Sequence, residues 1–463
     1  MKTDEGLNFL FILIDDLGWR DIGCYGSSFY ETPCLDRLAQ EGMRFTDAYA
    51  ACPVCSPTRA SILTGKYPAR LGVTNWIGGK ARGRLIAAPY VDHLALEEIS
   101  LASALKKAGY RTYHVGKWHL GGEPFWPEQH GFDVNIGGGE HGAPRRYFSP
   151  YANPRLTDGP DGEYLTDRLT DEAIRLIENN GDQPFFMHLS HYAVHTPIQT
   201  PERYLPKYEA KARMLGLDEA KVFEEGDFFP CEHKRDKRIQ RRLVQSSPEY
   251  AGMIQNLDEN IERVLQALEA SGQAERTVVL FTSDNGGLAT AESSPTCNAP
   301  LSEGKGWMYE GGTREPLLVR WPGVVAPDST CTAPVTSPDF YPTILEMAGA
   351  DPMPEQHCDG MSLVPLLKGG ESLGREAIYW HYPHYGNQGG TPGASIRHGD
   401  YKLIEFFEDD RVELYHLRHD VGEGENLAFD FPDLAHELQS HLHKWQHEVQ
   451  ARMPEPNPAW REE

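Results

Sequence analysis

Cys55 lies in a segment whose residue types and spacing could support chemistry on an anion. The segment reads Cys55-Ser56-Pro57-Thr58-Arg59 and continues Ala60-Ser61-Ile62-Leu63-Thr64-Gly65. Proline suits the first turn of a helix, and the free amide groups at a helix N-terminus attract negative charge. Arg59 adds a fixed positive charge nearby. The segment therefore predicts a helix whose amino-terminal end presents Cys55 to an anionic ligand.

Two other roles for Cys55 are open. Cys52 and Cys55 are spaced as C-x-x-C, which is typical of redox pairs, and free cysteines are often buried, unreactive thiols. Neither role explains the metal-type and cationic residues in other segments of the chain. We therefore interpret Cys55 as a reactive residue.

Two polar pairs follow apolar runs. Asp15-Asp16 follows residues 8–14, and Asp284-Asn285 follows the run that begins at Val278. Such runs are typical of strands buried in a parallel sheet, and sites in open α/β sheets form at the carboxyl ends of strands. Either pair alone could cap a turn or a helix. Together they favour a site for a hard cation such as Ca²⁺, which prefers oxygen ligands.

Lysine and histidine side chains form a third group of candidates. Lys117 and His119 alternate in the segment 115–121, so both point the same way if that backbone is extended. His195 follows the apolar stretch 185–189, and we prefer it to the neighbouring His191 as a functional residue. Lys305 begins the glycine-rich segment 305–316, where an ordinary exposed lysine is the alternative.

In this order the segments resemble the signatures of the type I sulfatases, the formylglycine-dependent arylsulfatase family of the alkaline phosphatase-like superfamily. The matching patterns are C-x-P-x-R, the Lys-Trp-His segment at 117–119, H-x-P at 195–197 and G-K-x-x-x-x-E-G-G-x-R-x-P at 304–316. The resemblance runs from Asn8 to about Pro322, and Arg397 to Leu417 resembles the family's C-terminal domain.

The resemblance implies roles for these residues. Cys55 would be oxidised to formylglycine by a maturation enzyme. Calcium would be bound by Asp15, Asp16, Asp284, Asn285 and the modified Cys55. The sulfate and the formylglycine would be contacted by Arg59, Lys117, His119 and Lys305, and the leaving group by His195 and Lys305.

The resemblance also implies a mechanism. The hydrated aldehyde attacks sulfur through one hydroxyl, which gives a sulfated enzyme intermediate. The second hydroxyl then loses its proton towards His119 and expels sulfate.

Two rival functions are weighed against sulfate hydrolysis. Phosphonate monoester and phosphodiester hydrolases of the same superfamily favour Asp-His where this chain has Asp284-Asn285. A catalytically silent glycan-binding relative would not need the complete set of candidate residues. Sulfate ester hydrolysis is therefore preferred.

The segment 380–390 bears on the substrate because it concentrates aromatic, imidazole and amide side chains. Such groups suit stacking on a sugar and hydrogen bonding to it, although a packed loop between strands is the alternative. We expect a sulfated carbohydrate rather than a simple aryl sulfate, with His381, His384 and Gln388 as substrate contacts.

Periodicity predicts the elements that position these residues. Helix-like stretches at 97–108, 166–178 and 249–270 alternate with apolar runs, which predicts an α/β fold with a large, mostly parallel central sheet flanked by helices. From residue 375 the pattern changes to short strand-like pieces, at 377–380, 394–397, 401–404 and 412–415, and a terminal helix at 433–451.

We therefore expect a catalytic domain over 1–374 and a smaller α+β domain with an antiparallel sheet over 375–463. Residues 207–247 are highly charged and predict a surface insertion, either a solvated excursion or a lid.

Bulk composition excludes some partners. The formal charge of the 463 residues is −24, which argues against nucleic acid and anionic membranes, so an anionic substrate needs a locally positive pocket. The apolar run near the N-terminus is too short to span a bilayer, and no signal-peptide pattern precedes it. We expect a soluble protein, periplasmic or secreted if a leader was removed and cytoplasmic otherwise. The eight cysteines are too sparse to require disulfides.

Overall fold

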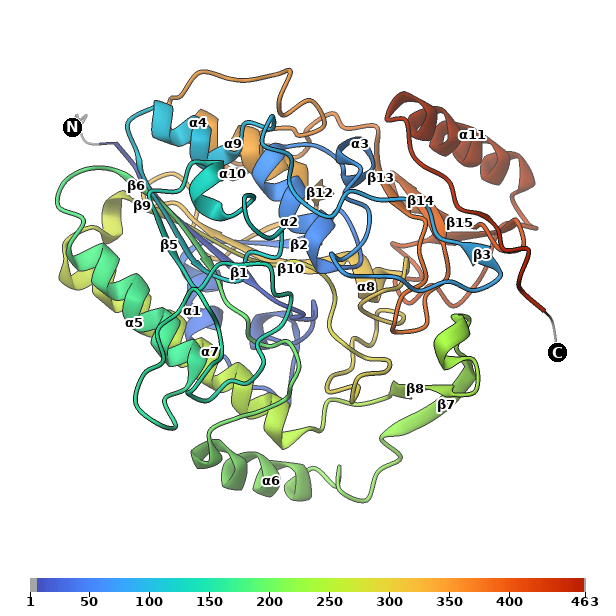
Figure 1. The fold of residues 1–463 in the computed structure, drawn as a ribbon, viewed down its shortest axis with the longest axis horizontal. Helices are drawn as coiled ribbons and strands as arrows, with labels where there is room; N and C mark the ends of the chain where they lie inside the picture. Colours follow the sequence, from blue (N-terminus) through green and yellow to red (C-terminus); the bar gives the residue numbers. More distant parts are fainter. Residues whose placement is uncertain (1–5, 462–463) are drawn as a thin grey trace.

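A computed structural model of the protein describes residues 6–461, which build one large sheet between two layers of helices and a smaller sheet at one side (Figure 1). The large sheet has nine strands in the order β11-β2-β10-β9-β1-β6-β4-β5, and β12 also pairs with β2. These strands are β1 (Asn8–Ile14), β2 (Met43–Tyr49), β4 (Arg111–Gly116), β5 (Val134–Ile136), β6 (Phe185–Ser190), β9 (Thr277–Ser283), β10 (Arg314–Arg320), β11 (Ser329–Cys331) and β12 (Val335–Thr336). Strands β9, β1, β6, β4 and β5 are mutually parallel, and β10 is antiparallel to both of its neighbours.

Strand β1 shows why the sheet is covered on both faces. All seven of its residues are buried. Alternate side chains of a strand point to opposite faces, so Leu10 and Ile12 pack on one side and Phe9, Phe11 and Leu13 on the other. The first face is covered by α1 (Pro33–Glu41), α5 (Leu165–Glu178) and α7 (Pro248–Ala270), and the second by α2 (Cys55–Thr64), α4 (Leu101–Lys107), α9 (Phe340–Met347) and α10 (Val364–Leu367). The prediction of an α/β fold is confirmed.

Helix boundaries follow the capping residues. Helix α7 begins at Pro248, where the Ser247 side chain accepts a hydrogen bond from the amide of Tyr250. The stretch predicted as a helix from residue 97 starts later, because Ser100 caps the amide of Ser103 and α4 begins at Leu101.

None of the helices within residues 6–461 combines the length and the apolar character that crossing a bilayer requires.

The C-terminal part forms a second sheet, as its pattern predicted. Its strands β13 (Ala377–Tyr382), β14 (Gly393–His398), β15 (Tyr401–Phe406) and β16 (Arg411–His416) are antiparallel. Helix α11 (Pro432–Glu448) packs on one face through Leu438 and Leu442. The other face packs against Tyr49, Val54 and Met308 of the main body. This small sheet therefore lies directly against the segment that precedes Cys55.

The charged stretch 207–247 has structure of its own. It contains most of α6 (Leu205–Met214), and then β7 (Phe223–Phe228) and β8 (Arg238–Arg242), which pair with each other. Phe229, Cys231 and Ile239 pack with Tyr385 of the segment that follows β13. Figure 1 shows β7 and β8 beside the small sheet. Four further elements are short: α3 (Pro68–Leu71), α8 (Glu310–Thr313), β3 (Leu85–Ile86) and β17 (Glu455–Pro456).

A buried ion cluster joins the small sheet to the main body. The ammonium of Lys402 on β15 lies 2.9 Å from Glu310 and 3.0 Å from Glu423, and all three side chains are fully buried. Arg314 pairs with Glu310 from the other side at 2.6 Å. Although burial alone would raise it, Lys402 and Arg314 lower the pKa of Glu310 to about 2.

We expect Lys402→Met to lower the free energy of unfolding by about 3–5 kcal/mol, because it leaves the buried carboxylate of Glu423 without a cation and Glu310 with Arg314 alone. Thermal unfolding of the variant measures the loss. The double variant Lys402→Met/Glu423→Gln also removes the unpaired charge of Glu423 and should therefore recover part of the lost stability. Equal stability of the wild type and the single variant would contradict the role given to this cluster.

Candidate active site

The predicted metal ligands come together at the ends of two adjacent strands. Strands β1 and β9 are parallel and in register from Asn8 with Thr277 to Ile14 with Ser283, so Asp15 and Asp16 follow one strand beside the point where Asp284 and Asn285 follow the other. The Asn285 amide donates to Asp16 Oδ1 at 2.8 Å. The four side chains are buried. The arrangement concentrates three carboxylates and one amide in a small volume.

This group of side chains fits a divalent cation. Asp15 Oδ1 and Asn285 Oδ1 are buried and accept no hydrogen bond from any described residue. Burial raises the pKa of Asp15 well above its ordinary value, Asp284 and Asp16 add to that effect, and Lys117 and Arg59 oppose it. A nearby metal ion would favour the charged carboxylate. Unshared carboxylate and amide oxygens are the ligands that Ca²⁺ prefers.

Three buried cations each pair with one of the carboxylates. The pairs are Arg59 with Asp284, Lys117 with Asp15 and Lys305 with Asp16, each at 2.7 Å. The guanidinium of Arg59 also donates to Ser190 Oγ and to the carbonyl of Lys117, which ties α2 to the ends of β6 and β4. Although burial opposes it, Asp16 keeps the pKa of Lys305 above its ordinary value. These cations offset the three carboxylates, so the site does not repel an anionic substrate as strongly as the acidity of the whole protein would suggest.

Cys55 is the first residue of α2 and lies beside this cluster. Its sulfur and a carboxylate oxygen from each of Asp15 and Asp284 all lie within 4.8 Å of one another. Burial raises the pKa of the Cys55 thiol, although Lys117 and Lys305 oppose that effect. A thiol that stays protonated is a weak nucleophile. The unmodified side chain is therefore poorly suited to attack a substrate here.

His119 faces Cys55 through an unprotonated nitrogen. Its Nε2–H donates to the Ile77 carbonyl at 3.1 Å, and Nδ1 lies 3.4 Å from Cys55 Sγ. Burial and then Lys117 lower the pKa of His119 well below its ordinary value, so the ring is neutral and the lone pair of Nδ1 faces Cys55. A Cβ at Gly142 would lie 2.4 Å from this ring, so the position has room only for glycine.

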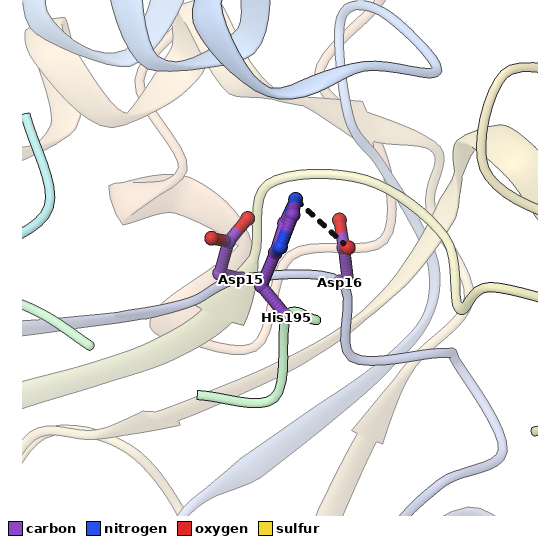
Figure 2. Close-up of side chains that lie close together, drawn as sticks. All are labelled: Asp15, Asp16 and His195. Carbon is purple, nitrogen blue, oxygen red and sulfur yellow. Dashed lines mark ion pairs between the residues drawn. The ribbon is translucent and has the colours of Figure 1, made fainter. Parts of the chain in front are cut away.

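His195 comes from the segment after β6. Its Nε2 lies 3.6 Å from Asp16 Oδ2, and Figure 2 shows the ring beside the Asp15 and Asp16 carboxylates. Nδ1 hydrogen-bonds to the Thr196 carbonyl at 2.8 Å. Burial, with Lys305 adding to it, lowers the pKa of His195 to about 3. The neighbouring His191 is fully buried, its ring nitrogens have no partner among the described side chains, and it does not line the cavity.

A cavity of about 280 Å³ opens above these groups. Of the predicted site residues, Cys55, His119, His195, Lys305 and Gln388 line it. It also contains side chains that the sequence did not single out, which are Trp76, Glu292 and Asn387. The structure thus places a nucleophile position, imidazoles, a cation and sugar-compatible groups around one space.

Two of the predicted substrate contacts lie elsewhere. The His381 ring is 4% exposed and hydrogen-bonds to the Arg452 carbonyl and to Gln446. The His384 ring is 1% exposed, hydrogen-bonds to Thr74 and packs edge-on against Tyr90. Neither ring lines the cavity, because β13 and the turn after it point these side chains into the protein. Gln388, in contrast, lines the cavity and donates to Glu292 at 3.1 Å.

Glu292 lies in a turn with an unusual backbone conformation, which the sequence did not predict. Residues 291–294 (Ala291, Glu292, Ser293 and Ser294) all have positive φ, which is unusual without glycine. Such conformations often occur at functional sites. This turn carries Glu292 to the wall of the cavity that Cys55 also lines, where no pattern of spacing would have placed it.

Comparison with known proteins agrees with this geometry. The family model described as Sulfatase matches residues 7–350, and the one described as N-sulphoglucosamine sulphohydrolase, C-terminal, matches residues 303–452. A protein named sulfatase from Formosa agariphila is 33% identical, with 95% of this chain and 88% of that protein covered. Human N-acetylgalactosamine-6-sulfatase is 32% identical, with 81% of this chain and 68% of that protein covered.

Among solved structures, the crystal structure of Ps i-CgsB in complex with k-i-k-neocarrahexaose aligns with a TM-score of 0.77 and 27% identity. The alignment covers 99% of this chain and 95% of that chain. The similarity therefore extends over both sheets.

Proposed function

The chain belongs to the sulfatase family, whose members are sulfuric ester hydrolases, and from that premise we propose that it removes O-sulfate groups from a carbohydrate by means of a formylglycine made from Cys55. One observation carries the proposal. Cys55 lies at the N-terminus of α2 beside the carboxylates of Asp15 and Asp284, with Nδ1 of His119 facing its sulfur and Lys305 on the cavity wall. The arrangement combines a nucleophile position, a proton acceptor and positive charge.

The proposal includes a cation and a modification. Asp15, Asp16, Asp284, Asn285 and the modified Cys55 would hold Ca²⁺. When present, the ion would offset developing negative charge, and the hydrated formylglycine would supply a hydroxyl nucleophile and a route for sulfate release. The high pKa of the Cys55 thiol supports the need for modification. The maturation enzyme that makes formylglycine is a further partner that the proposal requires.

The chain's own residues would do the rest. Arg59 would orient Asp284 and stabilise negative charge next to Cys55. Lys117 and Lys305 would bind the sulfate oxygens. Lys305, kept protonated by Asp16, would donate to the leaving oxygen. His195 would lie beside that oxygen, but its ring is neutral with the proton on Nδ1, so it would have to bind a further proton before it could donate from Nε2. His119, through Nδ1, would accept the proton released when sulfate is expelled.

A carbohydrate substrate is supported by two kinds of observation. The human relative named above is an N-acetylgalactosamine-6-sulfatase, and the aligned crystal structure contains neocarrahexaose. In this chain the cavity also presents an indole, a carboxylate and two amides from Trp76, Glu292, Asn387 and Gln388. Such groups can stack on a sugar ring and hydrogen-bond to its hydroxyls.

We also propose that the chain is divided into a catalytic domain and a smaller C-terminal domain. Residues 1–374 would form the catalytic domain and residues 375–463 the smaller domain, with the chain ends 1–5 and 462–463 outside the described residues. The segment 387–388 reaches the cavity from the smaller domain. This domain would therefore contribute to substrate binding as well as to stability.

A substrate panel tests the proposal. We expect matured enzyme to hydrolyse 4-nitrophenyl sulfate and at least one defined sulfated monosaccharide. Phenyl phosphonate and a phosphodiester serve as matched probes for the rival chemistry. Greater kcat/KM on either of those than on every sulfate ester would overturn the proposal, as would absence of sulfate release from protein with verified formylglycine.

Gln388→Ala separates sugar binding from sulfate binding. We expect kcat/KM for the accepted sulfated sugar to fall about 5- to 100-fold, the effect of losing about 1–3 kcal/mol from a buried hydrogen bond. Hydrolysis of 4-nitrophenyl sulfate should change little, because that substrate lacks the hydroxyls. Gln439→Ala, which removes a glutamine from α11 outside the cavity, is the control. Equal losses on both substrates would show that Gln388 supports the fold or the sulfate pocket instead.

A further inference from the structure

A second hollow continues from the active-site cavity, and we call it the outer groove. It has a volume of about 500 Å³ and is lined by Trp76, Gly78, Lys80, Ala81, Arg82, Glu232, His233 and Asn387. Trp76 and Asn387 also line the active-site cavity. The two spaces therefore share one wall, and a ligand bound in the cavity can extend into the outer groove.

Residues 76–82 and 232–233 form two sides of the outer groove, and these two segments are bonded to each other. Arg82 and Glu232 form an ion pair at 2.6 Å, and the Glu232 amide donates to the Arg82 carbonyl at 2.8 Å. Lys234 donates to the Asn387 carbonyl at 2.7 Å. Behind them, Cys231 and Phe229 pack on Tyr385. The insertion 207–247 is thus held against the groove and forms one of its walls.

The charge of the outer groove differs from that of the whole protein. Arg82 and Glu232 neutralise each other, whereas Lys80 has no ion-pair partner between residues 6 and 461 and is exposed. His233 adds an exposed imidazole, and Lys234 a further cation at the Asn387 side. The surplus charge is positive in a chain with a formal charge of −24. An anion is therefore favoured here and disfavoured over most of the surface.

Trp76 determines what kind of anion fits. Its ring stands at the junction of the two spaces and is only partly buried. An indole face binds the apolar face of a sugar ring, while a small inorganic anion would gain nothing from it. Beyond Trp76, Arg82 is neutralised by Glu232, and the charge that remains is that of Lys80, which with His233 matches a carboxylate or a second sulfate.

We propose that the outer groove binds the sugar next to the sulfated one and that this neighbour carries its own anionic group, held by Lys80 and His233. The inference rests on the proposed sulfatase function and extends it: the substrate is an acidic oligosaccharide with at least two negative charges. The sulfate to be removed occupies the cavity, Trp76 supports the sugars, and the second anion lies in the groove.

Four substrates test the inference on matured enzyme. They are 4-nitrophenyl sulfate, the sulfated monosaccharide accepted in the panel above, and two disaccharides in which that sugar is linked to a neutral hexose or to a uronic acid. We expect the uronic acid disaccharide to have the highest kcat/KM among the three sugars. Its advantage should decrease as salt is added, because the contact is exposed.

Variants of Lys80 locate the effect. Lys80→Ala should lower kcat/KM for the uronic acid disaccharide about two- to fivefold, and Lys80→Glu about tenfold or more. Both should leave 4-nitrophenyl sulfate and the monosaccharide unchanged. Lys107→Ala, which removes an exposed lysine at the end of α4, is the matched control and should change nothing.

The possible failures are distinct. Equal kcat/KM for the neutral and acidic disaccharides, or equal losses on all four substrates in the Lys80 variants, would overturn the outer groove while leaving the sulfatase function in place. Absence of hydrolysis of all four substrates would instead count against the proposed function.

Discussion

Replacing Cys55 with Ala is expected to lower kcat/KM for every accepted sulfate ester by roughly 10⁴-fold or more, the scale of loss when a covalent nucleophile is removed. The variant keeps the carboxylates and cations of the site but lacks the position at which formylglycine would form. Peptide mass spectrometry of active wild-type enzyme should show formylglycine at position 55. Full activity in protein whose Cys55 is an intact thiol would refute the mechanism.

Cys52→Ala is the matched control for this experiment. Cys52 lies three residues earlier and is as buried as Cys55, but it packs against the small sheet rather than facing His119. Its removal should leave turnover within a few-fold of the wild type. A comparable loss in both variants would point to damage of the loop before α2.

Removal of bound calcium is expected to lower kcat by roughly 10³-fold, because a bound metal ion supplies several kcal/mol of charge stabilisation in the transition state. Chelation followed by dialysis removes the ion, and added Ca²⁺ should restore activity. Metal analysis should find calcium in active enzyme. Calcium should also raise the melting temperature, since a ligand at 100 times its Kd stabilises the folded protein by about 2.7 kcal/mol.

Asp16→Ala should abolish the calcium-dependent rise in melting temperature, which provides a readout independent of activity. Asp21→Asn is its control. Asp21 is also buried near the end of β1, but its carboxylate is occupied by hydrogen bonds from Tyr250 and Thr296. Active enzyme without any divalent metal would exclude the proposed role of the strand-end carboxylates.

The sequence predicted those parts of the site that depend on local pattern. A short apolar run such as residues 8–14 favours a buried strand, and parallel neighbours end at the same edge of the sheet. Two local observations therefore indicated that Asp15 and Asp284 lie close together. The small antiparallel sheet was predicted in the same way, from the short strand-like segments that follow residue 375. Helix ends were less well predicted: α4 starts four residues late because Ser100 caps it, and the terminal helix ends at Glu448 rather than at residue 451.

Contacts between distant segments could not be predicted in this way. Trp76, Glu292 and Asn387 meet at the cavity although hundreds of residues separate the first from the last. The prediction for His384 met the same limit: its partner Thr74 lies 310 positions earlier, and composition alone could not show that His384 is packed against it. Composition shows which residues could bind a sugar, whereas packing decides which of them are available to one.

The position of Cys55 has a consequence for the order of events during biosynthesis. Cys55 is 3% exposed, and the loop before it is covered by the small sheet, whose strands follow Cys55 in the sequence. A cavity of about 280 Å³ can admit a sulfated sugar but not the catalytic centre of another enzyme. Under the proposed mechanism, oxidation of Cys55 would have to take place before residues 377–416 dock, while the chain is being synthesised or is otherwise unfolded. A molecule that folded first would then stay inactive, and the yield of active enzyme would depend on the relative rates of modification and folding.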